Sequence, residues 1–205
     1  MIGRVLRRLI PVRLRSSVRS YMSIALRRLK EPRMVWGYQD SSGEWRANTR
    51  ISDTVFFDHP EQINIGDNVF IGHYSILDGT GGLEIGEGCQ LAGWNGIYSH
   101  SSHIAIRIYG KHYQEVPEED KVAFKQATVR IGKYSFVGAG AIILSGITIG
   151  HGALIAAGSI VNKDVGDFEF VAGNPAKLIG NTKKLDETYL KDPQLLAWYE
   201  EWQKT

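Results

Sequence analysis

The sequence predicts an all-β solenoid, a parallel β-helix built of triangular coils, and two sequence patterns support this fold class. In the first pattern, aliphatic residues recur every six positions along two stretches of the chain. The later stretch contains Ile131, Val137, Ile143, Ile149, Ile155 and Val161, and the earlier one contains Ile65, Ile71, Leu77 and, after a two-residue slip, Ile85, Leu91 and Ile97. In the second pattern, a small or compact residue stands four positions after most of them: Ser135, Ala141, Ala153, Ser159 and Val165.

A period of six is neither the period of an α-helix nor the simple alternation of a β-strand. It is typical of a short strand followed by a corner, with one aliphatic side chain turned inward on each face. Three such faces give a coil of about 18 residues, and successive coils stack by parallel strand pairing. We therefore expect aliphatic ladders inside the solenoid and small residues at its corners.

The composition favours a globular protein with a substantial core. The chain has 205 residues, 43% of them hydrophobic, and a net charge of +2, which gives no reason to expect a nucleic-acid partner. Its single cysteine, Cys89, excludes an intrachain disulfide and fits a reducing, cytoplasmic compartment. Cys89 falls at the small inward position of the repeat that begins at Ile85, so we expect it to pack in the core. No apolar run is long enough for a membrane-spanning helix.

Residues 1–30 form a distinct basic segment with nine Arg or Lys residues and no acidic residue. Arginines interrupt any apolar stretch, so a signal peptide is a poor interpretation. An apolar stripe at helical spacing predicts an amphipathic helix: Leu14, Val18, Tyr21, Met22, Ala25 and Leu29. Such a helix suits the anionic inner face of the cytoplasmic membrane, or it packs on the domain or a neighbouring subunit.

The predicted solenoid domain covers residues 31–182 and contains one excursion, at about residues 104–127, where the repeat stops. Long non-repetitive loops in compact domains are often functional. Arg107, Tyr109 and Tyr113 of the excursion could contact sugar hydroxyls or a phosphate, and we expect the acidic run at residues 118–120 to face solvent. Residues 183–205 predict a C-terminal helix whose apolar stripe contains Leu195, Trp198, Tyr199 and Trp202. We expect this helix to cap the open end of the solenoid.

Three motifs carry a resemblance to a known family: the sequence IYSHSSH at residues 97–103, AAGSIVNKD at residues 156–164 and VAGNPAKLI at residues 171–179. Over residues 51–180 the chain resembles hexapeptide-repeat acyltransferases, and within them the maltose/galactoside O-acetyltransferase branch and its relatives that acetylate surface polysaccharides. The resemblance implies a left-handed β-helix, a homotrimer, and acetyl-CoA bound in the groove between adjacent subunits. It also implies transfer of an acetyl group to a sugar hydroxyl of a glycan acceptor.

Acetyl transfer from a thioester to a hydroxyl needs a base with a pKa near neutrality, which histidine supplies. His103 is the first candidate for this base and His100 is the alternative. The resemblance also places the N–H of Ala139 where it can stabilise the oxyanion that forms at the thioester carbonyl. The chemistry requires no metal and no covalent enzyme intermediate.

The resemblance further implies two sets of binding residues. The donor set comprises Gly138, Ala139, Ala157, Asn162, Lys163, Pro175 and Lys177. The acceptor set comprises the excursion residues, His73, near which relatives have a polar acceptor-binding residue, and Trp94 and Asn95. The last two stand one face before the histidines and could form a wall for the sugar, although plain packing is an equal alternative for Trp94.

Three other functions remain open from the sequence: N-acetylation of an amino sugar, a γ-carbonic-anhydrase-like zinc enzyme, and an inactive trimeric scaffold. The zinc enzyme requires a third histidine beside His100 and His103.

Overall fold

The computed structural model describes residues 20–23 and 31–204, so most of the basic segment lies outside the described residues. The chain divides into two units, residues 1–33 and residues 34–205. In the first unit, residues 20–23 are helical and exposed. The rest of the predicted amphipathic helix stays a prediction.

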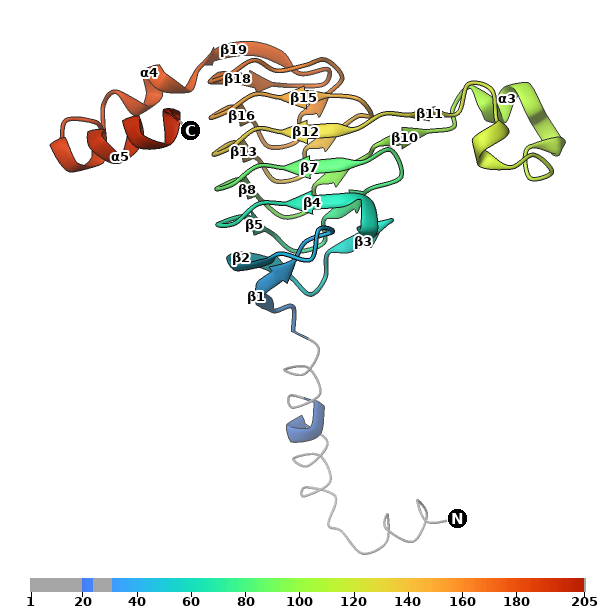
Figure 1. The fold of residues 1–205 in the computed structure, drawn as a ribbon, viewed down its shortest axis with the longest axis horizontal. Coiled ribbons are helices and arrows are strands. Elements are labelled where there is room, and N and C mark those ends of the chain that lie inside the picture. The colour runs from blue at the N-terminus through green and yellow to red at the C-terminus, as the bar shows by residue number, and fades with distance from the viewer. Residues whose placement is uncertain (1–19, 24–30, 205) are drawn as a thin grey trace, which may run out of the picture. The chain divides into compact units, whose positions relative to one another are not determined.

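The second unit is a parallel β-helix with three faces, as Figure 1 shows. Face A contains β2 (Trp45–Ser52), β5 (Phe70–Ile71), β8 (Gln90–Leu91), β13 (Phe136–Val137), β16 (Leu154–Ile155) and β18 (Glu169–Ala172). Face B contains β3 (Phe56–Asp58), β6 (Ile76–Asp78), β9 (Gly96–Ile97), β14 (Ile142–Ile143) and β17 (Ile160–Val161). Face C contains β4 (Ile63–Ile65), β7 (Leu83–Ile85), β12 (Val129–Ile131) and β15 (Thr148–Ile149). The chain visits faces C, A and B in turn, and a short 3-10 helix (Pro60–Gln62) precedes β4.

The predicted aliphatic ladders form the interior. Strands pair in register, so Ile65, Ile85, Ile131 and Ile149 lie one above another on face C. The corresponding ladders on the other faces are also buried, and burial of this apolar surface is the main source of stability. Cys89 is fully buried, donates to the carbonyl of Gly132 over 3.0 Å and has its pKa raised by burial to about 12. Its predicted packing role is confirmed.

Close stacking of coils explains some of the corner glycines. A Cβ on Gly138 would lie 2.4 Å from the backbone nitrogen of Ala157 in the next coil, closer than atoms can approach. Gly138 is buried and its N–H donates to Ile155. A glycine at this position therefore serves the packing of the coils.

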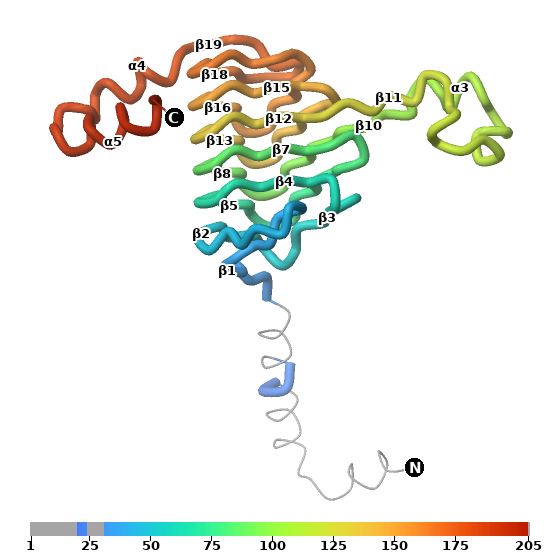
Figure 2. Tube along the Cα trace, viewed as in Figure 1, coloured from blue at the N-terminus to red at the C-terminus, as the bar shows by residue number. Residues whose placement is uncertain are grey.

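The excursion leaves the solenoid at the corner between faces B and C and projects away from the coils (Figure 2). Its stem is an antiparallel pair, β10 (His100–Ser101) and β11 (Lys125–Gln126). The outer part contains α3 (Ala105–Tyr109) and two 3-10 turns, Gly110–His112 and Glu118–Asp120. The stem thus starts at His100, four residues before the point at which the repeat visibly stops.

Antiparallel strands cover both ends of face A. At the first end, β1 (Met34–Gln39) pairs with β2, and at the last end β19 (Lys177–Asn181) folds back on β18. Two helices follow, α4 (Thr182–Asp186) and α5 (Pro193–Gln203), and α5 starts at an Asp192 cap with Pro193 in its first turn. The expectation that the C-terminal helix caps the end of the solenoid is wrong, because Trp202 of α5 packs sideways on Tyr134 and Phe168. Pairing with β19 already covers the last strand.

Candidate active site

His100 is held by a buried carboxylate at the corner between faces B and C, here called the B/C edge. The imidazole Nδ1 lies 2.6 Å from Oδ2 of Asp78, which ends strand β6 in the coil below. The Asp78 side chain is 2% exposed and the His100 side chain is 33% exposed. Since an ionised carboxylate can only accept, Nδ1 carries the proton, and Nε2 is left as the basic nitrogen.

Backbone donors fix the Asp78 carboxylate. Its Oδ2 accepts from the N–H of Ser99 at 2.8 Å and of His100 at 3.2 Å, and its Oδ1 accepts from the N–H of Thr80 at 2.8 Å. Burial by itself would raise the pKa of Asp78, but the hydrogen bonds from Thr80, Ser99 and His100 outweigh burial and lower the pKa. Asp78 is therefore ionised at neutral pH and orients the ring of His100.

The excursion contributes to the surroundings of the same ring. Phe124, just before β11, packs on the imidazole with ring centroids 5.6 Å apart. The His100 ring therefore contacts two groups, the carboxylate of Asp78 through its Nδ1 atom and the ring of Phe124. This restricts His100 to one orientation, as a general base requires.

His103 lies in a different environment. It is exposed, and its Nδ1 lies 2.6 Å from the Oγ of Ser101, a neutral hydroxyl that is itself only partly buried. Its carbonyl accepts a hydrogen bond from Arg107. Among the described side chains, the partner that hydrogen-bonds to the His103 ring is this hydroxyl, and no carboxylate orients the ring. The geometry therefore ranks His100 above His103 as the base, the reverse of the order expected from sequence.

The corner between faces A and B, here called the A/B edge, carries a second group of expected site residues. Ala139 and Ala157 are exposed at equivalent positions of successive coils, where the N–H of Gly158 donates to the carbonyl of Ala139 at 2.9 Å. Pro175 and Lys177 are exposed near the same edge, beyond Gly173, whose carbonyl accepts from Ile160. Gly138 belongs to this edge but is buried between the coils, so it does not line the surface.

Asn162 and Lys163 lie on the other edge. They follow β17 directly and are exposed at the B/C corner of the last coil, two coils above His100. The structure thus divides the expected donor residues between two edges, which face B separates.

The residues expected to bind the acceptor differ in their exposure and hydrogen bonding. His73 lies on the A/B edge with its Nδ1 2.5 Å from the Oγ of Ser52. Trp94 is 68% exposed one coil higher, and its ring contacts that of Tyr74 in a tilted arrangement. The assignment of Asn95 to the acceptor wall is wrong. Asn95 is 1% exposed, its amide nitrogen donates to Ala92 at 2.6 Å, and its oxygen accepts from the N–H of Ala141 at 3.0 Å. Asn95 links neighbouring coils through these hydrogen bonds and has no exposed surface that could contact a sugar.

In the excursion, the three residues expected to contact the acceptor also make contacts within the excursion itself. Arg107 donates to the His103 carbonyl, and the phenol oxygen of Tyr109 accepts from the N–H of Val122 at 2.8 Å. The ammonium of Lys121 lies 4.1 Å from the ring centre of Tyr113. Their predicted contact with the acceptor stays a prediction.

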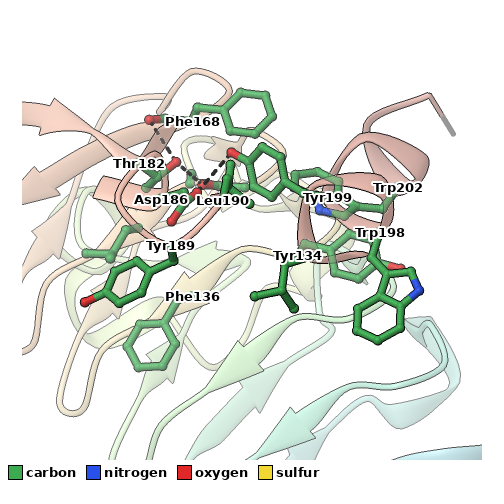
Figure 3. Close-up of a pocket in the computed structure, with 14 residues that line it drawn as sticks. Tyr134, Phe136, Phe168, Thr182, Asp186, Tyr189, Leu190, Trp198, Tyr199 and Trp202 are labelled. Atoms are coloured by element: carbon green, nitrogen blue, oxygen red, sulfur yellow. Dashed lines mark hydrogen bonds between the residues drawn. The ribbon is translucent and has the colours of Figure 1, made fainter. Parts of the chain in front are cut away.

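A groove of about 500 Å³ lies apart from these residues, between face A and helices α4 and α5. Figure 3 shows its aromatic lining, with Tyr134, Phe136 and Phe168 from the coils and Tyr199 and Trp202 from α5. Burial, the hydrogen bond to Asp186 and that carboxylate's charge raise the pKa of Tyr199 to about 12. None of the expected site residues lines this groove.

Asp78 is a candidate site residue that was not among those expected from the sequence. It stands 22 residues before His100, about one coil earlier, directly after the inward-facing Leu77. The signal available in the sequence was a carboxylate that stands about one coil before a candidate base.

Among residues 20–23 and 31–204, no three His, Cys, Asp or Glu side chains gather as metal ligands would. Within the same residues, no helix is both long and apolar enough to cross a bilayer.

Comparison with known proteins agrees with this architecture. The family described as bacterial transferase hexapeptide (six repeats) matches residues 128–163, and the hexapeptide repeat of succinyl-transferase matches residues 62–98. The dTDP-4-amino-4,6-dideoxy-D-glucose acyltransferase of Escherichia coli is 30% identical over 67% of this chain and 81% of its own length.

Two solved structures share the fold. The maltose O-acetyltransferase of Clostridium difficile 630 superposes with a TM-score of 0.53 at 28% identity, covering 63% of this chain and 64% of that one. A hexapeptide-repeat acetyltransferase of Vibrio cholerae O1 biovar eltor, complexed with acetyl-CoA, gives a TM-score of 0.52 at 25% identity, covering 62% and 64%. This chain belongs to the hexapeptide-repeat acyltransferase family, and it is an acyltransferase with the left-handed β-helix of that family.

Proposed function

We propose that the protein is a homotrimeric, acetyl-CoA-dependent O-acetyltransferase that acetylates a sugar hydroxyl, with His100 as the general base. The single observation that carries this proposal is the hydrogen bond between the buried Asp78 and Nδ1 of His100. It leaves Nε2 of a partly exposed imidazole free to take a proton. The choice of acetyl-CoA as donor and of a sugar hydroxyl as acceptor is supported by the names of two solved relatives, an acetyl-CoA complex and a maltose O-acetyltransferase.

The proposed reaction is a direct transfer. Nε2 of His100 removes the proton of the acceptor hydroxyl as its oxygen attacks the thioester carbonyl. The Asp78 carboxylate stabilises the imidazolium that forms. The carbonyl oxygen becomes an oxyanion, which the N–H of Ala139 stabilises; this N–H donates to no backbone carbonyl of the described residues. When the intermediate collapses, the C–S bond breaks and the imidazolium returns its proton to the CoA sulfur.

The positions of the expected residues support a site between subunits. His100, Asn162 and Lys163 lie on the B/C edge, whereas Ala139, Ala157, Pro175 and Lys177 lie on the A/B edge. A full strand of face B separates the two edges within one chain, so the two groups complete one site only if the B/C edge of one chain meets the A/B edge of another. Three chains arranged with face B toward a common axis would produce three such sites.

The outward side chains of face B suit this arrangement. At the first position of each strand they are apolar or glycine: Phe56, Ile76, Gly96, Ile142 and Ile160. The two carboxylates of this face, Asp58 and Asp78, stand at the ends of β3 and β6, toward the B/C edge. The outward side chains of face C are polar: Asn64, Glu84, Arg130 and Thr148. Both faces bury the same kind of aliphatic ladder, so the interior does not explain the difference. An apolar outer face marks a surface that another chain covers.

A second candidate, N-acetylation of an amino sugar, is favoured by the name of the Escherichia coli relative, which acts on an amino-deoxy sugar nucleotide. One experiment separates the two. Purified protein is incubated with labelled acetyl-CoA and a panel of glycan precursors that carry either free hydroxyls only or an amino group. We expect label in the hydroxyl acceptors, released by mild alkali as an ester is; alkali-stable label confined to amino sugars would establish the second candidate. The His100→Ala variant is the control, and its unreduced labelling would contradict the proposed base.

We also propose that the acceptor is a precursor of a bacterial surface polysaccharide, met at the inner face of the cytoplasmic membrane. The basic composition of residues 1–30 supports this, since about 1 kcal/mol of attraction to an anionic surface is expected for each basic residue close to it. Flotation with anionic liposomes, with and without residues 1–30, tests the membrane contact. Equal flotation of the two proteins would refute it.

A further inference from the structure

The A/B edge changes character along its length. Four corner residues in successive coils, Tyr74, Trp94, Gly140 and Gly158, share the left-handed backbone conformation, with φ of 61°, 66°, 70° and 69°. Hydrogen bonds stack these corners: Trp94 N–H donates to His73, Gly140 N–H to Gly93 and Gly158 N–H to Ala139, over 2.8, 3.0 and 2.9 Å. The four positions therefore form one line along the edge.

The upper half of this line has open glycine corners and the lower half is an aromatic shelf. A Cβ added at Gly140 or Gly158 would meet nothing within 4 Å, so the surface beside Ala139 and Ala157 is empty. Immediately below, the rings of Trp94 and Tyr74 contact each other in a tilted arrangement, with centroids 4.7 Å apart. The open surface thus ends at the indole of Trp94.

The indole is placed there at a conformational cost, because bulky residues disfavour the left-handed region that glycine adopts freely. Two other aromatic residues, Tyr134 and Phe168, adopt the same conformation at the corner between faces C and A, where Trp202 covers their rings. Trp94 has Tyr74 beneath it and is 68% exposed. Packing within the described chain therefore explains the aromatic corners on that edge but not the outer face of Trp94.

We infer that Trp94, supported by Tyr74, is the floor of the donor-binding surface beside Ala139 and Ala157, and that it restricts the donor to a short acyl group. The inference rests on the proposed function, in which the N–H of Ala139 holds the thioester oxygen. Adjacent rungs of a β-sheet lie about 4.8 Å apart, so Trp94 is one rung from the reacting carbonyl. An acetyl methyl group fits in that interval, whereas a four-carbon acyl chain would need the space that the indole occupies.

The test is Trp94→Gly, which gives this corner the residue found in the next two coils and removes the conformational cost, so folding is preserved. With one saturating acceptor, kcat/KM is measured for acetyl-CoA, propionyl-CoA and butyryl-CoA. We expect the butyryl-to-acetyl ratio to rise at least about 10-fold, since single methylene groups in a pocket are discriminated by about 10- to 200-fold. Trp94→Phe should give a smaller rise, and Tyr74→Gly, one rung further from the carbonyl, should change the ratio little.

A ratio unchanged within about twofold in Trp94→Gly would overturn the inference. If the KM for the acceptor rises in that variant while the acyl preference stays, the shelf binds the sugar instead and the inference fails. These outcomes differ from failure of the proposed function, in which the wild-type protein would transfer no acyl group from any of the three donors. Circular dichroism and sedimentation of each variant confirm that the fold and assembly are intact.

Discussion

The two edges of face B carry different groups, and in the proposed function neither is sufficient for the chemistry. The B/C edge holds the proposed base, His100, fixed by the buried Asp78 and in contact with Phe124 of the excursion. On the A/B edge, the described histidine, His73, bonds to a serine hydroxyl and not to a carboxylate, and the edge offers the Ala139 N–H beside corners that glycine leaves open. One edge can take a proton and the other can receive a thin, extended donor. Under the proposed function, the difference means that this fold distributes a reaction over two surfaces that only assembly brings together.

The largest expected effect comes from separating the chains. Ile142→Lys places a charge at the centre of face B, on an outward side chain whose loss leaves the buried ladder unchanged. We expect it to abolish the trimer, and with it all measurable activity, because a charge at the core of an interface has no partner. Thr148→Lys on the polar face C is the matched control and should leave assembly unchanged. Analytical ultracentrifugation measures both, and a trimeric, active Ile142→Lys protein would remove face B from the interface.

The next effect concerns the two histidines of the B/C edge. His100→Ala should lower kcat about 100- to 10,000-fold, the usual contribution of a general base. His103→Ala should change kcat by less than about tenfold, because its exposed ring is bonded to a serine and not to a carboxylate. Steady-state kinetics with saturating acetyl-CoA provide the comparison. If His103→Ala proves the more damaging variant, the order expected from sequence is right and the geometric ranking is wrong.

A smaller effect is expected from Asp78→Asn, because Asp78 is a positioning residue. Misorientation of the imidazole should cost kcat roughly 100-fold with the KM for acetyl-CoA unchanged. The same variant should alter acid stability. The folded pKa of Asp78 is lowered, so its contribution to stability is present above the ordinary carboxyl pKa and is lost as the pH falls through the folded value. Thermal unfolding from neutral pH to pH 3 should therefore show a flatter acid limb in Asp78→Asn. An acid limb as steep as that of the wild type would contradict this role.

Much of the fold was predictable from the sequence because a period of six identifies the inward side chains. Ile65, Ile85, Ile131 and Ile149 were named from spacing alone and form one buried ladder. The position of α5 was not predictable, since its apolar stripe indicates a buried face but not which surface covers it. The C-terminal helix was expected over the last coil, and it packs on Tyr134 and Phe168 at the side.

The site was predictable in its residue types and less so in its arrangement. Asn95 was expected in a sugar-binding wall because, with Trp94, it stands one face before the histidines. The last position of a corner turns inward, however, and its amide bonds to the backbone of Ala92 and Ala141. Asp78 was missed because its partner lies one coil away, and stacking of coils is a three-dimensional relation that local motifs do not contain. The division of the donor residues between two edges became visible only when each corner was assigned to a face.

The most direct test of the shared site is complementation between two inactive variants. Ala139→Pro removes the N–H at the A/B edge, and proline suits the position before a left-handed glycine in a turn. His100→Ala removes the base at the B/C edge. If the two chains are unfolded and refolded together in equal amounts, each mixed trimer contains one intact site, so we expect activity to return to about a quarter of the wild-type rate. A mixture that contains mixed trimers and stays as inactive as its parents would show that the site lies within a single chain.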